Sequence, residues 1–146
     1  MLSIGQPAPS FEAQSTLGPI RLGDVLGKRP IVLIFYPKDE TPVCTKQLCA
    51  VRDSKSQYAE YDALVLGVNP GSLEEHRQFS QKFMYDFPLV SDADERIRKL
   101  YDVGKVLFFI QQRIVYVINR SGIIVYAQKG NRPTSEILAA LQADRD

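Results

Sequence analysis

Residues 31–44 read IVLIFYPKDETPVC. Residues 31–36 form a continuous run of apolar, β-branched and aromatic side chains, which is typical of a strand buried on both faces of a sheet. Pro37 follows directly and cannot donate to a strand ladder, so we predict that the strand ends there. Pro42 suits the first position of a helix, where a missing N–H costs nothing, and Thr41 before it suits the N-cap. The segment therefore predicts a buried strand, a short loop and the start of a helix.

Cys44 falls in the first turn of this predicted helix. The N–H groups there have no partner within the helix, and the helix dipole places positive potential beside them. Both effects stabilise a thiolate and lower the pKa of a cysteine in this position. Because the thiolate is the reactive form, Cys44 is a candidate nucleophile.

Outward from this segment, predicted strands and helices alternate along the chain. A second apolar run at residues 63–68 (ALVLGV) predicts another buried strand. Residues 42–61 lie between the two runs and are long enough for a crossover helix, which gives a βαβ unit with parallel strands. In two later places a Ser or Asp is followed three residues on by a glutamate, which forms a capping box. These predict a helix over residues 72–84 and a shorter one over residues 92–101.

The C-terminal third of the sequence has a different pattern. Runs at residues 113–118 (RIVYVI) and 123–127 (IIVYA) flank the turn sequence NRSG, so we predict a β-hairpin. A final helix is predicted over residues 133–143 and a short one around residues 22–26. A βαβ unit followed by a hairpin and a helix is the order of a thioredoxin-like fold, an α/β fold with a central mixed sheet flanked by helices. We predict a single domain of this kind over residues 1–146.

Composition narrows the classes of function. The 146 residues include 18 Lys and Arg against 17 Asp and Glu, scattered along the chain, which argues against a nucleic-acid or membrane-surface role. No stretch approaches the ~20 apolar residues of a membrane span, and the N-terminal residues lack a basic region followed by an apolar run. We therefore expect a cytoplasmic protein. Two cysteines and one histidine are too few for a structural zinc site, so neither a metal nor another cofactor is expected.

The motif around Cys44 carries a resemblance to a known family. The spacing Pro-x-x-x-Thr-x-x-Cys, made by Pro37, Thr41 and Cys44, resembles the active-site signature of the peroxiredoxins. The wider string YPKDETPVCT at residues 36–45 is similar to the subfamily named after bacterioferritin comigratory protein, also called the Q type. The resemblance covers nearly the whole chain and includes the stretches GQPAPSF (residues 5–11) and FPLVSD (residues 87–92).

This resemblance implies a thiol peroxidase. Cys44 would attack one peroxide oxygen, while Thr41 and Arg113, which matches the family's active-site arginine, would donate to the charge that develops on the other oxygen. Pro37 would limit the access of water to the sulfenic acid formed. The implied substrates are hydrogen peroxide and alkyl hydroperoxides, and the implied reductant is thioredoxin or a similar dithiol protein. Q-type relatives are often monomers, so a monomer is expected.

Cys49 is the resolving thiol that the resemblance implies, through an intramolecular disulfide with Cys44 as in an atypical 2-Cys peroxiredoxin. On a regular helix, two cysteines at this spacing are separated by a rise of ~7.5 Å and point in different directions. A disulfide needs Cα atoms within about 7 Å and converging Cβ atoms. The first turns of the helix must therefore unwind if the two cysteines pair. The alternative is that Cys49 is an inert core thiol and that an external thiol resolves the sulfenic acid.

Two features depart from the Q-type pattern, and two other classes of protein fit the same fold. Val43 stands where many Q-type members have glycine, and residues 104–112 have no close match. A dithiol reductase of the thioredoxin type uses Cys-x-x-Cys, whereas four residues separate the cysteines here. A redox sensor or holdase would use the same cysteines without efficient turnover.

Other polar and aromatic residues receive structural interpretations. His76 is interpreted as part of the solvated face of its helix. Asp39 and Glu40 are interpreted as acidic residues that favour the helix N-terminus. Phe79 and Phe83 share one face of a helix and are interpreted as core or active-site wall.

Overall fold

The computed structural model describes residues 1–108 and 110–145, except for the side chains of Cys44 and Arg145. The described residues form a seven-stranded mixed sheet in the order β2-β1-β5-β4-β3-β8-β9, and a separate hairpin of β6 and β7. The strands are β1 (Glu12–Ser15), β2 (Gly18–Arg21), β3 (Ile31–Phe35), β4 (Leu64–Asn69), β5 (Leu89–Ser91), β6 (Lys105–Val106), β7 (Ile110–Gln111), β8 (Ile114–Ile118) and β9 (Ile124–Lys129). The helices are η1 (Leu22–Asp24), α1 (Pro42–Asp53), α2 (Lys55–Glu60), α3 (Leu73–Phe83), α4 (Arg96–Leu100) and α5 (Thr134–Arg145).

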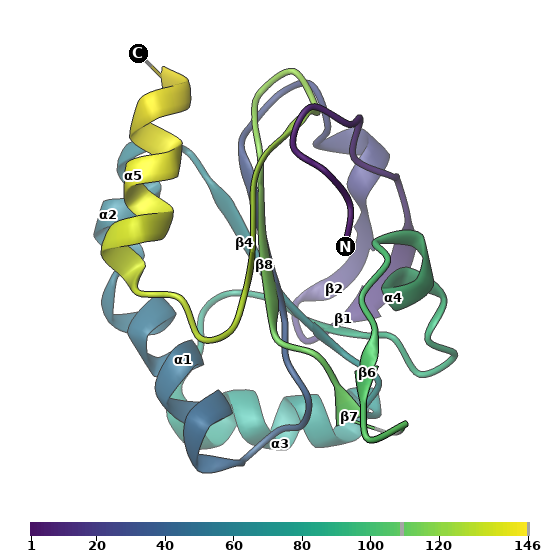
Figure 1. The fold of residues 1–146 in the computed structure, drawn as a ribbon. Coiled ribbons are helices and arrows are strands. Elements are labelled where there is room, and N and C mark those ends of the chain that lie inside the picture. The colour runs from purple at the N-terminus through teal and green to yellow at the C-terminus, as the bar shows by residue number, and fades with distance from the viewer. Residues whose placement is uncertain (109, 146) are drawn as a thin grey trace.

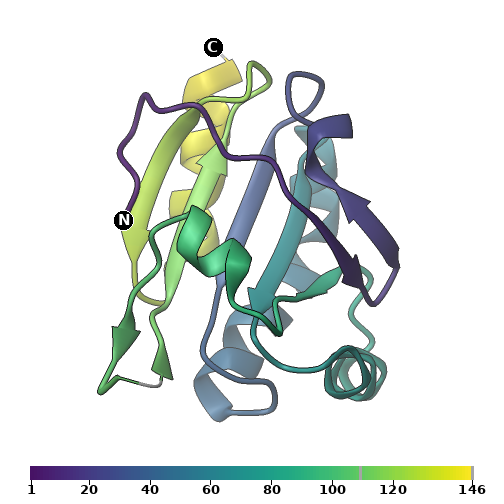
Figure 2. The same ribbon diagram turned by 90° about the vertical axis from the view of Figure 1, so that its right-hand side faces the viewer.

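Strand β3 lies at the centre of the sheet, parallel to β4 and antiparallel to β8. Its residues are buried throughout and alternate between two cores. Val32 and Ile34 pack with residues of α1, α2, α3 and α5, whereas Leu33 and Phe35 pack with residues of η1 and α4. Figure 1 shows α1, α2 and α5 on one side of the sheet, and Figure 2 shows α4 in front of the other. The prediction of a strand buried on both faces is confirmed.

The thioredoxin-like fold predicted from the order of elements is confirmed. Strands β3 and β4 are joined by helices and run parallel, with Ile31 opposite Leu64. Strands β8 and β9 form the predicted antiparallel hairpin. Ser72 Oγ accepts a hydrogen bond from the Glu75 N–H at 3.1 Å, so the predicted N-cap of α3 is also confirmed.

Two helix predictions are wrong in detail. The crossover is not one helix over residues 42–61, because it breaks at Ser54, which ends α1 and precedes α2. The residue pair Asp92 and Glu95 does not form a capping box either. The Asp92 carboxylate instead accepts the N–H groups of Ile97 and Arg98, both at 2.9 Å, and α4 begins only at Arg96.

Three strands of the sheet were not predicted. Strands β1, β2 and β5 are three or four residues long, so each is too short for an alternating pattern to stand out. Strand β5 pairs with β4 in parallel and with β1 antiparallel, which extends the sheet beyond the predicted strands. No helix among the described residues is long and apolar enough to cross a membrane.

Candidate active site

The N-terminus of α1 places Cys44 where the sequence predicted. Thr41 is the N-cap in extended conformation and Pro42 is the first helical residue. The first helical hydrogen bond runs from the Thr45 N–H to the Thr41 carbonyl at 2.8 Å. The amides of Val43 and Cys44 precede it and therefore have no partner within the helix. The backbone of Cys44 lies beside the positive end of α1, while its side chain is outside the described part.

Thr41 does not cap the helix through its side chain. Its hydroxyl donates instead to the Lys38 carbonyl at 3.2 Å and thereby closes the loop before the helix. Thr41 also lines a hollow of about 330 Å³ between this loop and α3. The predicted position of Thr41 is right, but the predicted capping contact is not formed.

A buried polar cluster anchors the loop of residues 37–41. Asp39 Oδ1 accepts hydrogen bonds from the Tyr36 hydroxyl at 2.7 Å and from Asn69 Nδ2 at 3.1 Å, and Asp39 Oδ2 lies 2.5 Å from His76 Nδ1. The His76 side chain is 0% exposed, so its interpretation as part of a solvated face is wrong. Asp39 is likewise a buried anchor, which adds to its expected effect on the helix N-terminus.

The contacts of His76 indicate how many protons the pair of His76 and Asp39 holds. His76 Nε2 is 3.2 Å from the Val90 carbonyl, which can only accept, so Nε2 carries a proton. His76 Nδ1 faces Asp39 Oδ2, so a second proton must lie between these two atoms. Whichever atom carries that proton, the pair has no net charge, which allows it to be buried.

A second set of residues lies at the same end of the sheet. Pro37 and Arg113 line a largely apolar groove of about 420 Å³ together with Val106, Ile110 and Gln111. Gln111 Nε2 donates to the carbonyls of Tyr36 at 2.8 Å and Val68 at 3.0 Å. Gln111 therefore ties β7 to the ends of β3 and β4. Figure 1 shows these strand ends, the start of α1 and the β6–β7 hairpin at the lower end of the molecule.

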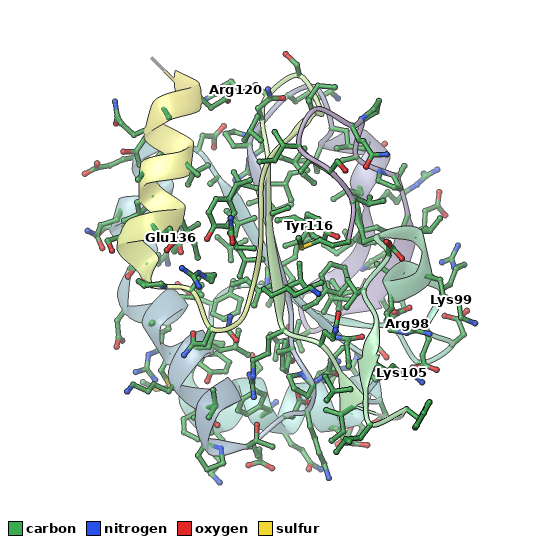
Figure 3. All side chains as sticks on the ribbon, viewed as in Figure 1. Arg98, Lys99, Lys105, Tyr116, Arg120 and Glu136 are labelled. Carbon is green, nitrogen blue, oxygen red and sulfur yellow. The ribbon has the colours of Figure 1, made fainter. Side chains whose placement is uncertain are left out.

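Arg113 is the arginine at this end of the sheet that lines the groove with Pro37. Arg120 follows β8 at the opposite end, as Figure 3 shows, and faces the carbonyls of Lys28 and Tyr61. Arg132 pairs with Glu136 at 2.6 Å. The structure thus brings Pro37 and Arg113 together, whereas Thr41 lines a separate hollow.

Cys49 lies in the second turn of α1 and is partly buried against the core. Its Sγ is 3.4 Å from the Tyr85 hydroxyl, which also donates to the Thr45 carbonyl at 3.3 Å. The neighbouring Gln47 side chain is buried, and neither of its amide atoms has a hydrogen-bond partner within the described part of the chain. Cys49 is thus neither solvent-exposed nor a fully buried thiol.

The AhpC/TSA family matches residues 4–127. The chain belongs to this family. It is 34% identical to the peroxiredoxin Bcp of Bacillus subtilis, over 99% of this chain and 96% of that protein. It is 38% identical to the chloroplastic peroxiredoxin Q of Sedum lineare, over 82% of this chain but only 65% of that protein.

Solved structures of the family agree with this assignment. The fold matches the peroxidoxin BcpB of Mycobacterium tuberculosis with a TM-score of 0.90 at 28% identity, covering both chains completely. It also matches a bacterioferritin comigratory protein of Xanthomonas campestris with a TM-score of 0.83 at 26% identity, over 93% of this chain and 92% of that one. The predicted resemblance to the Q-type peroxiredoxins is confirmed, and the chain is a thiol peroxidase of this family.

Three residues of the site had no role predicted from the sequence. His76 could have been placed from its spacing, because residues 76, 79, 80 and 83 follow the period of one helix face and include two phenylalanines. Gln111 is 75 residues from its partner Tyr36, and Tyr85 is 36 residues from its partner Cys49. No local sequence pattern predicts contacts over such separations.

Proposed function

We propose that the chain reduces hydrogen peroxide and small organic hydroperoxides, with Cys44 as the attacking thiol and Cys49 as the resolving thiol. The position of Cys44 in the first turn of α1 carries the proposal, because this position favours a thiolate. The thiolate attacks the terminal peroxide oxygen, so an S–O bond forms as the O–O bond breaks. The other oxygen leaves as hydroxide or alkoxide and takes up a proton.

Arg113 and the Cys44 amide are the proposed donors to the charge on the leaving oxygen, with Thr41 as a third donor once its hydroxyl turns from Lys38. Arg113 remains charged at any working pH and so also favours the thiolate. Pro37 shields the sulfenic acid from water. The apolar groove beside Pro37 and Arg113 supports organic hydroperoxides as substrates, because its volume of about 420 Å³ suits a small organic group. A structure of the Xanthomonas campestris relative is described in terms of alkyl peroxide reduction.

In the proposed second step, the Cys49 sulfur attacks the sulfur of the Cys44 sulfenic acid. An S–S bond forms, the S–O bond breaks and water leaves. A dithiol protein such as thioredoxin then reduces the disulfide by thiol–disulfide exchange and is itself oxidised.

The proposal is tested with the wild type and two single variants, Cys44→Ser and Cys49→Ser. Wild type mixed with hydrogen peroxide and a thioredoxin system should consume NADPH through many turnovers, and Cys44→Ser should consume none. Cys49→Ser should still form one sulfenic acid per chain, detected by mass spectrometry after trapping. If the wild-type protein is oxidised once but does not consume NADPH through repeated turnovers, the result would indicate a redox sensor or holdase. Loss of the first oxidation in folded Cys49→Ser would reverse the roles of the two cysteines.

A further inference from the structure

Tyr85 links the resolving cysteine to the helix turn that contains it. It follows Met84, the left-handed residue that ends α3, and its ring packs against Phe79 and Phe87 with centroids 5.2 Å away in each case. These contacts fix the ring, so the hydroxyl points at α1 in a defined position. There it lies 3.4 Å from Cys49 Sγ and 3.3 Å from the Thr45 carbonyl.

The Thr45 carbonyl lies in the helical turn between the two cysteines and accepts two hydrogen bonds. In an α-helix the carbonyl of one residue accepts from the N–H four residues later, so the Thr45 carbonyl pairs with the Cys49 N–H. The Tyr85 hydroxyl adds a second donor to the same oxygen. Tyr85 therefore reinforces the helical turn that must unwind before Cys44 and Cys49 can form a disulfide.

The Tyr85 hydroxyl has one proton, so it can donate to either Cys49 Sγ or the Thr45 carbonyl, but not to both at once. While Cys49 is a thiol, its S–H donates to the Tyr85 oxygen, and Tyr85 donates to the Thr45 carbonyl. A thiolate can only accept. When Cys49 ionises, the Tyr85 proton therefore turns to the sulfur, and the Thr45 carbonyl loses this donor.

The surroundings keep Tyr85 in its protonated form throughout. Burial, followed by the hydrogen bond with Cys49, raises the pKa of Tyr85 well above its ordinary value. Among the described residues, the charged groups that act on Tyr85 are Arg52 of α1, which also acts on Cys49, and Asp39 from the loop before α1. Arg52 is itself held by a hydrogen bond to the Phe83 carbonyl at 2.8 Å and by Asp53 at 3.0 Å.

We infer that Tyr85 is a positioning residue for the resolving step. It holds Cys49 and the helical turn in place while Cys49 is a thiol, and its hydroxyl proton moves from the Thr45 carbonyl to the sulfur when Cys49 ionises. The ionisation of Cys49 and the loss of the Tyr85 hydrogen bond to the Thr45 carbonyl therefore occur together. The inference rests on the proposed function of Cys49, whose thiolate attacks the Cys44 sulfenic acid, with hydroxide leaving and taking up a proton as water.

The test compares wild type with Tyr85→Phe, which keeps the ring and removes the hydroxyl. The rate of disulfide formation after one equivalent of hydrogen peroxide is followed from low to high pH by acid quenching and mass spectrometry. Tyr126→Phe is the matched control, because the Tyr126 hydroxyl donates to Glu136 of α5 at 2.5 Å. At high pH, Cys49 is a thiolate in wild type and in both variants. There we expect Tyr85→Phe to form the disulfide about two- to tenfold faster than wild type, because the hydrogen bond from the Tyr85 hydroxyl to the Cys49 sulfur no longer has to break.

A second measurement does not depend on disulfide formation. In a Cys44→Ser background, the alkylation of Cys49 by iodoacetamide is followed against pH. Tyr85→Phe should move the midpoint of this profile to higher pH, because the thiolate loses a donor, and Tyr126→Phe should leave it unchanged. A purely structural role for Tyr85 would not move this midpoint.

The outcomes separate this inference from the proposed function. A wild type that forms no disulfide between Cys44 and Cys49 would overturn the proposed function and the role of Tyr85 with it. A wild type that forms the disulfide, combined with a Tyr85→Phe variant whose high-pH rate or alkylation midpoint equals that of wild type, would overturn the role of Tyr85 alone.

Discussion

Replacing Asp39 by alanine should cost far more stability than a carboxylate at the start of a helix normally contributes. The Asp39 side chain is 7% exposed and is the shared hydrogen-bond partner of three buried groups: the Tyr36 hydroxyl, the Asn69 amide and the His76 ring. Each buried polar group left unpaired costs about 1–3 kcal/mol. Because the loop can relax and admit water, we expect Asp39→Ala to lower the free energy of unfolding by about 3–5 kcal/mol, as for a broken buried ion pair. That is a large part of the ~5–15 kcal/mol that holds a domain together.

The assay is urea unfolding followed by far-ultraviolet circular dichroism. Glu40→Ala is the matched control, because the neighbouring Glu40 carboxylate is 48% exposed and pairs with Lys82 in solvent, so its loss should cost less than about 1 kcal/mol. Asp39→Asn should fall between the two, since its oxygen still accepts from Tyr36 and Asn69. A free energy of unfolding for Asp39→Ala within about 1 kcal/mol of Glu40→Ala would refute the anchoring role.

Two further predictions concern the reaction itself. Arg113→Ala should slow the second-order reaction with hydrogen peroxide, measured by competition kinetics, by about two to three powers of ten. Arg120→Ala, at the opposite end of the sheet, should react at the wild-type rate. A near-normal rate for Arg113→Ala would assign the role to another group. In hydrogen exchange, the amides of residues 45–52 should lose protection when the disulfide forms, while β3 and β4 keep theirs. Unchanged protection in a verified disulfide form would contradict the unwinding of α1.

The parts of the fold that the sequence predicted are those that short stretches encode by themselves. The central strand is a continuous apolar run, the loop after it is bounded by Pro37 and Pro42, and the β8–β9 hairpin surrounds an evident turn. Strand β5 contains only three residues and exists because β4 and β1 lie beside it. The helix break at Ser54 could not be predicted, because no proline or glycine lies near it in the sequence.

The candidate site divides in the same way. The position of Cys44 follows from residues within a few places of it, so the motif was enough to place its backbone at the start of α1. The partners of Asp39, Gln111 and Cys49 come from other elements of the fold, and tertiary packing alone brings them together. The mistaken interpretation of His76 arose because a histidine was counted as polar, although its helical spacing with Phe79 puts it on the buried face.

The break between α1 and α2 limits how far the proposed disulfide could disturb the fold. Helix unwinding is cooperative and spreads along an uninterrupted run of hydrogen bonds. Helix α2 starts afresh, with the N–H groups of Gln57 and Tyr58 donating to the Ser54 carbonyl, so its first turn does not depend on α1. Tyr58 is 3% exposed and would keep α2 attached to the core during the proposed opening of α1. If the chain turns over by the proposed disulfide cycle, this boundary confines the change to one helix, because the rest of the scaffold would not have to be remade in each cycle.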